Sequence, residues 1–331
     1  MASALPADWE SDRPLLVGAG HALPIDACLD RARRIAQALP DAAGVVNLCE
    51  RRDAFILAFT AALLRGQVSL LPPSRAPAAV AEVMAAHPGC VVVDDATVEA
   101  ALAGGAAPAA TDRFPPHPHA VIGYTSGSTG LPKPNPKTWD SYLATTAHNA
   151  ARIRAQIGRH EGTPTIVATV PPQHMYGMET SVLIPLLAGM AVHVGRPLFP
   201  ADVAAALAEV PAPRVLVSTP VHLRSLVESG MTFPTVAVVV SATAPLDAAL
   251  AGRVEAALGG PVLEMFGATE TCVFATRRTS LGEDWHAYEG IALDAGEEST
   301  TVTAPWLPGP TVLQDVVESL ADGRFRLRGR N

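Results

Sequence analysis

The chain has 331 residues, of which 49% are hydrophobic and 17% charged, and its formal net charge is −8. A chain of this length can bury a large core and is expected to divide into two or three lobes. The negative charge argues against nucleic acid as a main partner, and no apolar run reaches the roughly 18 residues of a membrane-spanning helix.

The N-terminus does not resemble a secretion signal, because it carries Asp8, Glu10 and Asp12 where a signal would be basic and then apolar. The cysteines show no metal-binding spacing and are interpreted as reduced thiols. They are Cys28, Cys49, Cys90 and Cys272. We therefore expect a cytoplasmic protein with no membrane span.

The N-terminal part of the chain alternates between strand and helix patterns. Residues 45–49 and 68–71 are short apolar runs typical of buried strands, with a helical pattern over residues 53–64 between them. A helix over residues 77–86 and a strand over residues 90–94 extend this into a second βαβ unit.

The Ala-, Gly- and Pro-rich stretch 101–118 predicts a connector between lobes, after which the alternation resumes. Further strands are predicted over residues 120–124 and 165–170, and others begin at Ala191, Arg214, Val236 and Val262. Helices are predicted from Thr138, over residues 178–187, and from near Pro200, Pro220 and Pro245. Proline suits the first turn of a helix. Right-handed crossovers should make the sheets mainly parallel and doubly wound, which is an α/β fold.

Residues 124–133, YTSGSTGLPK, form the most informative motif of the chain. They leave the end of a predicted strand, where open α/β sheets bind ligands. The groups suited to phosphate oxygens are the hydroxyls of Thr125, Ser126, Ser128 and Thr129, the backbone N–H groups near Gly127 and Gly130, and the Lys133 ammonium. The motif is not a P-loop, because prolines flank Lys133, and a Ser/Gly linker would rarely follow an apolar strand directly.

This motif resembles the signature loop of the adenylate-forming superfamily, which includes acyl- and aryl-CoA synthetases, luciferases and adenylation domains of peptide synthetases. Members of that family activate a carboxylic acid with ATP to give an acyl-adenylate, and usually pass the acyl group to a thiol. The resemblance implies an N-terminal α/β lobe over residues 1–110, a nucleotide- and acid-binding α/β lobe over 111–270, and a small β-rich lobe over 271–331.

A second match, residues 171–177 (PPQHMYG), lies between a predicted strand and a predicted helix. In the family, the residue at the place of His174 lies beside the acid pocket, although a lone histidine is more often a loop or core residue. The resemblance implies an acid pocket near His174, Met175, Tyr176, Met178, Ser218, Thr219, Ser241, Ala242, Phe266 and Val273.

The third and fourth matches are residues 241–246 (SATAPL) and 266–270 (FGATE), which resemble the adenine-binding turn and the family's Tyr-Gly-x-Thr-Glu motif. Gly267 would let the backbone approach a ligand, Thr269 would face the α-phosphate, and the Glu270 carboxylate suits Mg²⁺. A strand-end Phe is ordinarily a core residue, but Phe266 stands in place of the family's tyrosine and is expected at the adenine or the acid.

The fifth match is spaced: Asp315, then Asp322-Gly323, then Gly329-Arg330. Asp-Gly alone is a common hairpin turn, but the family has a ribose-binding aspartate, a tight turn and a Gly-Arg in this order. The implied nucleotide-binding residues are Ser241, Ala242, Thr243, Ala244, Pro245, Met265, Phe266, Gly267, Thr269, Asp315 and Arg330. The implied catalytic residues are Lys133, Thr269, Glu270 and Arg330.

The chain stops at Asn331, where the family has a hinge to a C-terminal domain that carries another lysine. We therefore expect the large N-terminal domain of a longer enzyme, which binds ATP or an acyl-adenylate better than it catalyses. Three departures from the family pattern are Pro134, Ser241-Ala242 in place of a glycine-rich pair, and Leu313-Gln314 in place of Thr-Gly.

The expected activity is an ATP- and Mg²⁺-dependent acid:thiol ligase with CoA, or the phosphopantetheine of an acyl carrier protein, as acceptor. A small aryl acid such as a hydroxybenzoate is favoured, and the short N-terminal lobe is similar to that of the aryl-acid ligases of pigment pathways. A fatty-acyl substrate stays open, because methionines and alanines also line acyl channels. A second class of function also stays open, in which the protein is a non-catalytic nucleotide-binding relative of these ligases.

Overall fold

The computed structural model describes residues 3–4, 9, 11–18, 20–104, 113–114, 119–126 and 132–330. The chain forms two compact units, each made of two stretches of sequence. Unit 1 comprises Met1–Tyr142 and Pro171–Arg196, and unit 2 comprises Leu143–Val170 and Pro197–Asn331. These units interleave along the chain, whereas the three predicted lobes are consecutive segments, and the lobe boundaries stay a prediction.

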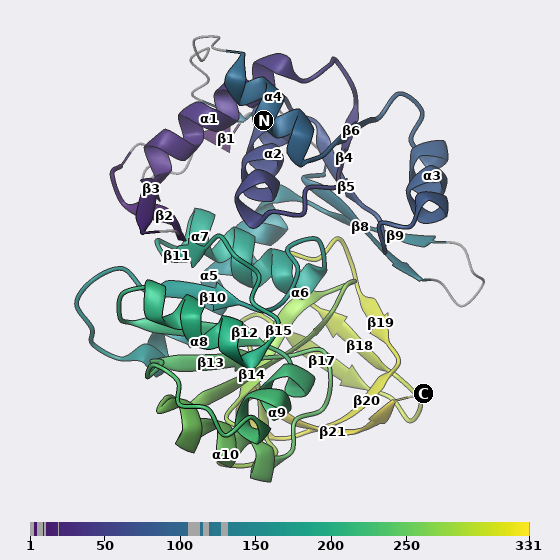
Figure 1. Ribbon diagram of the computed structural model, residues 1–331. Coiled ribbons are helices and arrows are strands. Elements are labelled where there is room, and N and C mark those ends of the chain that lie inside the picture. Colours follow the sequence, from purple (N-terminus) through teal and green to yellow (C-terminus); the bar gives the residue numbers. More distant parts are fainter. Residues whose placement is uncertain are drawn as a thin grey trace. The chain divides into compact units, whose positions relative to one another are not determined.

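Unit 1 contains a five-stranded sheet in the order β6-β4-β5-β8-β9, in which β9 alone runs antiparallel to its neighbour. The strands are β4 (Gly44–Asn47), β5 (Val68–Leu71), β6 (Val91–Val93), β8 (Val121–Ser126) and β9 (Pro132–Lys137). The helices that connect them are α2 (Arg52–Leu64), α3 (Pro77–Ala86) and α4 (Asp95–Ala103). The crossovers through α2 and α3 run in opposite directions along the sheet, so right-handed connections place these helices on opposite faces (Figure 1).

The rest of unit 1 includes two antiparallel pairs, a parallel strand and a long irregular helix. These elements are β1 (Ser3–Ala4), β2 (Pro14–Gly18), β3 (His21–Pro24), α1 (Ile25–Ala38), β7 (Arg113–Phe114), α6 (Met175–Met178), a π-helical turn (Glu179–Leu183), α7 (Ile184–Leu187) and β11 (Ala191–His193). Trp9 Nε1 and Arg13 donate to the carbonyl of Leu186, at 2.8 and 3.0 Å. They satisfy a carbonyl in the last turn of α7, which has no partner within the helix.

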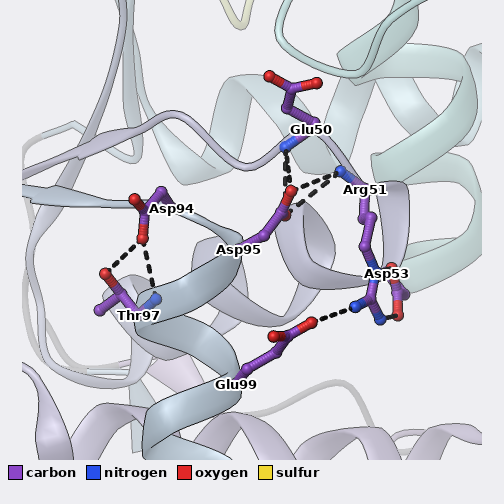
Figure 2. Close-up of polar contacts among 7 residues, drawn as sticks. All are labelled: Glu50, Arg51, Asp53, Asp94, Asp95, Thr97 and Glu99. Carbon is purple, nitrogen blue, oxygen red and sulfur yellow. Dashed lines mark hydrogen bonds and ion pairs between the residues drawn. The ribbon is translucent and has the colours of Figure 1, made fainter.

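A polar network joins the entry of α2 to α4 (Figure 2). The Asp95 carboxylate accepts from the backbone N–H groups of Glu50 and Arg51 at 3.2 and 3.3 Å. The Arg51 guanidinium donates to Asp53 at 3.1 Å and to Glu99 at 2.6 Å. These contacts fix the loop that follows β4 against the helix that follows β6.

Within unit 2, four parallel strands, β10-β12-β13-β14, continue into four antiparallel ones, β15-β16-β21-β20, and a separate sheet has the order β17-β18-β19. The strands are β10 (Thr165–Ala168), β12 (Arg214–Ser218), β13 (Val238–Ser241), β14 (Val262–Ala268), β15 (Cys272–Arg277), β16 (Trp285–Ala287), β17 (Ala292–Ala295), β18 (Thr300–Thr303), β19 (Thr311–Leu313), β20 (Asp315–Ser319) and β21 (Arg324–Arg330). The helices are α5 (Trp139–Ile157), which begins in unit 1, α8 (Pro200–Glu209), α9 (Pro220–Glu228), α10 (Ala248–Leu258) and a 3₁₀ turn (Ala321–Gly323).

The fold predicted from the sequence is confirmed: mainly parallel α/β sheets are followed by a β-rich segment after residue 271. The predicted bounds of β5 and α3 agree with the structure. Residues 105–112 and 115–118 of the predicted connector lie outside the described residues, and the pair Arg113–Phe114 between them forms β7. All four cysteines lie in described segments and carry free thiols.

Candidate nucleotide- and acid-binding site

The two arms of the signature loop form an antiparallel hairpin in unit 1. Thr125 on β8 lies opposite Lys133 on β9. Asn135 is 5% exposed, and its Nδ2 donates to Thr125 Oγ1 at 3.4 Å and to the Lys133 carbonyl at 3.0 Å. The hairpin therefore presents Thr125 and Lys133 side by side. The tip, residues 127–131, lies outside the described residues, so the phosphate contacts of Gly127, Ser128, Thr129 and Gly130 stay predictions.

The strand that leads into this loop is fixed by a histidine that the sequence did not single out. His87, which follows α3, hydrogen-bonds through Nε2 to the hydroxyl of Tyr124, and the two rings meet edge to face at 6.2 Å. Tyr124 is 8% exposed, and burial raises the pKa of its hydroxyl. This contact anchors β8 immediately before Thr125.

Asp315 and Arg330, the two residues predicted at the ribose, are partners across the hairpin of β20 and β21. The predicted tight turn is confirmed, because Asp322 and Gly323 have φ angles of 60° and 69°. Such angles favour glycine, and asparagine or aspartate tolerate them better than other side chains do. The hairpin therefore brings together two residues that lie 15 positions apart in the sequence.

The FGATE motif forms a second hairpin, with Thr269 and Glu270 half-buried in the turn between β14 and β15. A Cβ atom at Gly267 would lie 2.2 Å from the carbonyl oxygen of Cys272. Glycine is therefore required here for the close approach of the partner strand. Thr271 Oγ1 accepts from the N–H of Ala268 at 3.1 Å and holds the turn closed.

Phe266 belongs to an aromatic cluster. Its ring lies 5.2 Å from those of Phe274 and Trp285 and 5.9 Å from that of Phe325, and the side chain stays half-buried. Such contacts are typical of a phenylalanine at a strand end that packs in a hydrophobic core. A contact of the same ring with adenine or with the acid stays a prediction.

A row of polar residues crosses the parallel strands in unit 2, at the carboxyl ends of β10, β12 and β13 and within β14. Thr169 follows β10, and Ser218, Ser241 and Glu264 are partners in register on β12, β13 and β14. Thr169 Oγ1 lies 3.0 Å from both Ser218 Oγ and His222 Nδ1, the latter on α9. The fully buried Ser241 Oγ has no hydrogen-bond partner within the described part of the chain.

Glu264 closes this row with an ion pair. Its carboxylate accepts from Arg277 Nε at 2.7 Å and from Thr279 Oγ1 at 2.6 Å, and the Arg277 guanidinium stacks over Trp285 at 4.4 Å. Only Ser218 and Ser241 of this row were predicted as site residues from the sequence. The available signal was a polar residue at or just after the end of β10 and β12, whereas Glu264 lies inside β14 and gave no such signal.

The predicted adenine turn follows β13 directly. Ala242 is buried, Thr243 is exposed, and Thr243 has a φ angle of 80°. A β-branched residue is strained in this region of backbone space, and strained residues concentrate at ligand-binding turns. This geometry is compatible with the predicted role, while the adenine contacts of Thr243, Ala244 and Pro245 stay predictions.

The acid motif begins α6 in unit 1. His174 is the N-cap and is exposed, whereas Tyr176 and Met178 are buried, and the Tyr142 hydroxyl donates to Met175 Sδ at 3.8 Å. Although the residue as a whole is exposed, nearby protein atoms partly desolvate its imidazole, and this desolvation, with a smaller contribution from the Arg196 guanidinium, lowers the pKa of His174. The imidazole is therefore neutral at pH 7 and can accept a proton or a hydrogen bond.

The predicted acid-pocket residues divide between the units. His174, Met175, Tyr176 and Met178 belong to unit 1, while Ser218, Thr219, Ser241, Phe266 and Val273 belong to unit 2. Thr219 is the N-cap of α9, and Val273 is 5% exposed on β15. The pocket as a whole stays a prediction.

Among the predicted site residues, Glu270 has the chemistry that suits the Mg²⁺ ion implied by the family resemblance. Glu270 offers a half-buried carboxylate, and Mg²⁺ is commonly bound by one or two carboxylates together with substrate phosphates. Among the described residues, no group of three or more His, Cys, Asp or Glu side chains could hold a metal by itself.

The described part of the chain contains no helix with the length and hydrophobicity that a membrane span requires.

Comparison with known proteins gives the family. Residues 77–293, more than half of the chain, match the family model described as AMP-binding enzyme. The chain belongs to the AMP-binding enzyme family. The resemblance to adenylate-forming enzymes is thereby confirmed, and four of the five sequence motifs lie inside the matched region.

Two curated relatives of this AMP-binding family member carry the name 4-coumarate–CoA ligase. The protein of Rhodobacter capsulatus is 31% identical over 206 residues, which are 62% of this chain and 50% of that protein. The protein of Halorhodospira halophila is 34% identical over 148 residues, 44% of this chain and 34% of that protein. The chain thus spans half or less of the length of these relatives.

Solved structures share the fold. The o-succinylbenzoate CoA synthetase of Bacillus subtilis, in complex with its acyl-adenylate intermediate, has a TM-score of 0.80 at 16% identity, covering 97% of this chain and 76% of that one. ATP-bound MatB from Rhodopseudomonas palustris has a TM-score of 0.76 at 18% identity, covering 96% and 76%. At such identities the likeness establishes the fold alone.

Proposed function

We propose that this member of the AMP-binding enzyme family takes part in the ATP-dependent activation of a carboxylic acid to an acyl-adenylate, followed by transfer of the acyl group to CoA. The observation that carries the proposal is the family match over residues 77–293, which contains the signature loop, the acid motif, the adenine turn and the FGATE hairpin in the family's order. Transfer to an acyl carrier protein is the alternative for the acceptor.

We further propose an aryl acid as substrate. Both curated relatives are named for 4-coumarate, which is an aryl acid, and both exceed 30% identity. The predicted pocket residues His174, Tyr176 and Ser241 could bind polar substituents of an aromatic ring. The methionines beside them are compatible with a fatty-acyl chain, so the experiment below compares the two classes.

The proposed chemistry brings anions together. A carboxylate must approach the α-phosphate of ATP in line, so the site has to neutralise charge and fix the orientation of both reactants. Lys133 and Thr125, side by side on the β8–β9 hairpin, would hold the terminal phosphates. Asp315 and Arg330 would orient the ribose, and Thr269 would face the α-phosphate.

Glu270 is the residue that we propose to bind Mg²⁺, whose chemical contribution is to neutralise phosphate charge. His174, kept neutral at pH 7 by its lowered pKa, would lie beside the acid without adding a positive charge to that pocket.

The test is a set of thermal shifts of this chain with ATP·Mg²⁺ and with non-hydrolysable acyl-adenosine sulfamates, because binding to the native state raises Tm without needing turnover. One set of sulfamates carries 4-coumaroyl or 4-hydroxybenzoyl groups and the other carries alkyl chains. A shift confined to the aryl set supports the proposal, and a shift confined to the alkyl set moves the substrate to fatty acids. If ATP raises Tm and neither sulfamate set does, the chain is better described as a nucleotide-binding relative.

A further inference from the structure

The starting observation is a buried cation at the beginning of α2. Apart from Asp53, every residue of this helix is buried, and the side chains from Ala54 to Leu64 are apolar except for Thr60. Arg52 is nevertheless 1% exposed. Burying a guanidinium carries a large desolvation cost, and a positive charge in the first turn also opposes the helix dipole.

The Arg52 guanidinium contacts a turn that follows the acid motif. Its Nη1 donates to the hydroxyl of Ser181, which is fully buried in the π-helical turn Glu179–Leu183. Burial, with a smaller contribution from the Arg196 guanidinium, lowers the pKa of Arg52 to about 10, so the group stays charged at pH 7. The contact is therefore a charge-assisted hydrogen bond, which is stronger than a neutral one.

The Ser181 hydroxyl connects Arg52 to the backbone of the acid motif. Its Oγ accepts from Arg52 and donates to the carbonyl of Gly177 at 2.6 Å, which uses the hydroxyl once as acceptor and once as donor. The neighbouring Thr180 Oγ1 donates to the carbonyl of Tyr176 at the same distance. Two consecutive carbonyls of the acid motif are thus held by hydroxyls one turn later.

The backbone at this point tolerates little displacement. A Cβ atom at Gly177 would lie 1.9 Å from the carbonyl oxygen of Pro171, so the start of α6 packs directly on the preceding loop. π-Helical turns are rare and frequent at functional sites. The position of Gly177 therefore determines where the adjacent Tyr176 and the N-cap His174 are placed.

We propose that Arg52 is a positioning residue for the acid-binding motif, acting through the Ser181 hydroxyl on the backbone of Tyr176 and Gly177. This inference rests on the proposed function, because it takes residues 171–177 as the motif that binds the acid. In this role Arg52 would act on the motif and not on the reacting groups themselves. Its role would be to hold the motif in the geometry that the acyl group requires.

The test measures dissociation constants of this chain for AMP and for 4-coumaroyl-adenosine sulfamate by calorimetry. Arg52→Met removes the guanidinium at similar length, and Ser181→Ala removes the relay with a smaller change in volume. Each variant is expected to weaken the sulfamate on the order of tenfold, the value of one charge-assisted hydrogen bond, with AMP affinity unchanged. The double variant should lose less than the sum of the two single losses, because the effects of residues in direct contact are not additive.

The matched control is Arg65→Met, at the opposite end of α2, where the guanidinium donates to the Ala36 carbonyl and lies 3.5 Å from Asp41. It should leave both dissociation constants unchanged. Equal weakening of AMP and sulfamate, additive losses in the double variant, or no loss in Ser181→Ala would each overturn the positioning role. Should Arg52→Met fail to fold, Ser181→Ala still decides the question. If the wild-type chain binds AMP and no acyl sulfamate, the proposed function fails together with this inference.

Discussion

At the scale of single residues, the buried ion pair of Glu264 and Arg277 gives a stability prediction. The side chains are 4% and 15% exposed and their atoms lie 2.7 Å apart. Glu264→Gln leaves the Arg277 charge without its counter-ion in a largely water-excluded place. We expect a loss of about 3 kcal/mol in the free energy of unfolding, the magnitude for removing one partner of a buried pair, as measured by urea denaturation.

The control for this variant is an exposed pair on the same unit. Glu318 pairs with Arg328 across the β20–β21 hairpin, and both side chains are more than 40% exposed. Glu318→Gln should cost less than about 1 kcal/mol, because water and ions already screen such pairs. Equal losses for the two variants would contradict the role assigned to burial at Glu264.

A second residue-scale prediction concerns the ribose. Asp315 is the residue that we propose to accept hydrogen bonds from the ribose hydroxyls. Asp315→Asn removes a charged acceptor and should weaken ATP on the order of tenfold, measured by calorimetry. Asp294→Asn, an exposed aspartate on the nearby strand β17, is the matched control and should leave ATP affinity unchanged. A wild-type affinity in Asp315→Asn would place the ribose elsewhere.

At the scale of elements, the junction of α2 and α4 in Figure 2 depends on one carboxylate. Asp95 accepts from the backbone N–H groups of Glu50 and Arg51, and hydrogen bonds to a charged group contribute about 2 kcal/mol. Asp95→Ala should therefore destabilise the entry of α2 by about 2 kcal/mol. The direct readout is faster hydrogen exchange at the Glu50 and Arg51 amides.

Glu99 supplies the control for this junction. It contacts Arg51 from the next turn of α4, but its side chain is 64% exposed. Glu99→Gln should change stability by less than about 0.5 kcal/mol and leave the exchange of both amides as in the wild type. Unchanged amide exchange in Asp95→Ala would show that the carboxylate does not hold this loop.

One element, β9, could not be predicted because its sequence argues against a strand. Residues 132–137 read PKPNPK, and proline cannot donate to a sheet ladder. The structure places the strand at the edge of the sheet, with Lys133, Asn135 and Lys137 opposite alternate residues of β8. The prolines occupy the intervening positions, whose N–H groups would face away from β8, so no ladder bond is lost.

Other features were predictable because they depend on local patterns. The apolar run of β5 and the proline-initiated helix α3 have the predicted bounds, and the Asp322-Gly323 turn has the predicted backbone. Arg52 and Glu264 were not found, because each lies within a helix or strand and is distinguished only by burial and by partners far away in the sequence. Gly267 was predicted to let the backbone approach a ligand, which stays a prediction, whereas the close approach that the structure shows is that of the partner strand.

At the scale of the whole molecule, each compact unit is built from two separate stretches of the sequence. The acid motif belongs to unit 1, although the strand before it, β10, and the helix after the inserted segment, α8, belong to unit 2. Sequence order alone therefore could not assign the motif to a unit. It also follows that the residues proposed for nucleotide binding and for acid binding are contributed by both units.

The effect of ligand binding on the Tm of this chain tests the proposed metal site. Glu270 is the residue that we propose to hold Mg²⁺, and a ligand that binds only the native state at 100 times its Kd adds about 2.7 kcal/mol of stability. Glu270→Gln keeps the shape of the side chain but removes its charge, so the extra rise in Tm that Mg²⁺ adds to ATP should disappear. Glu297→Gln, in the exposed turn between β17 and β18, is the matched control and should retain the full rise. The rise is measured from each variant's own Tm without ligand, and a Mg²⁺-dependent rise that persists in Glu270→Gln would place the metal on another carboxylate.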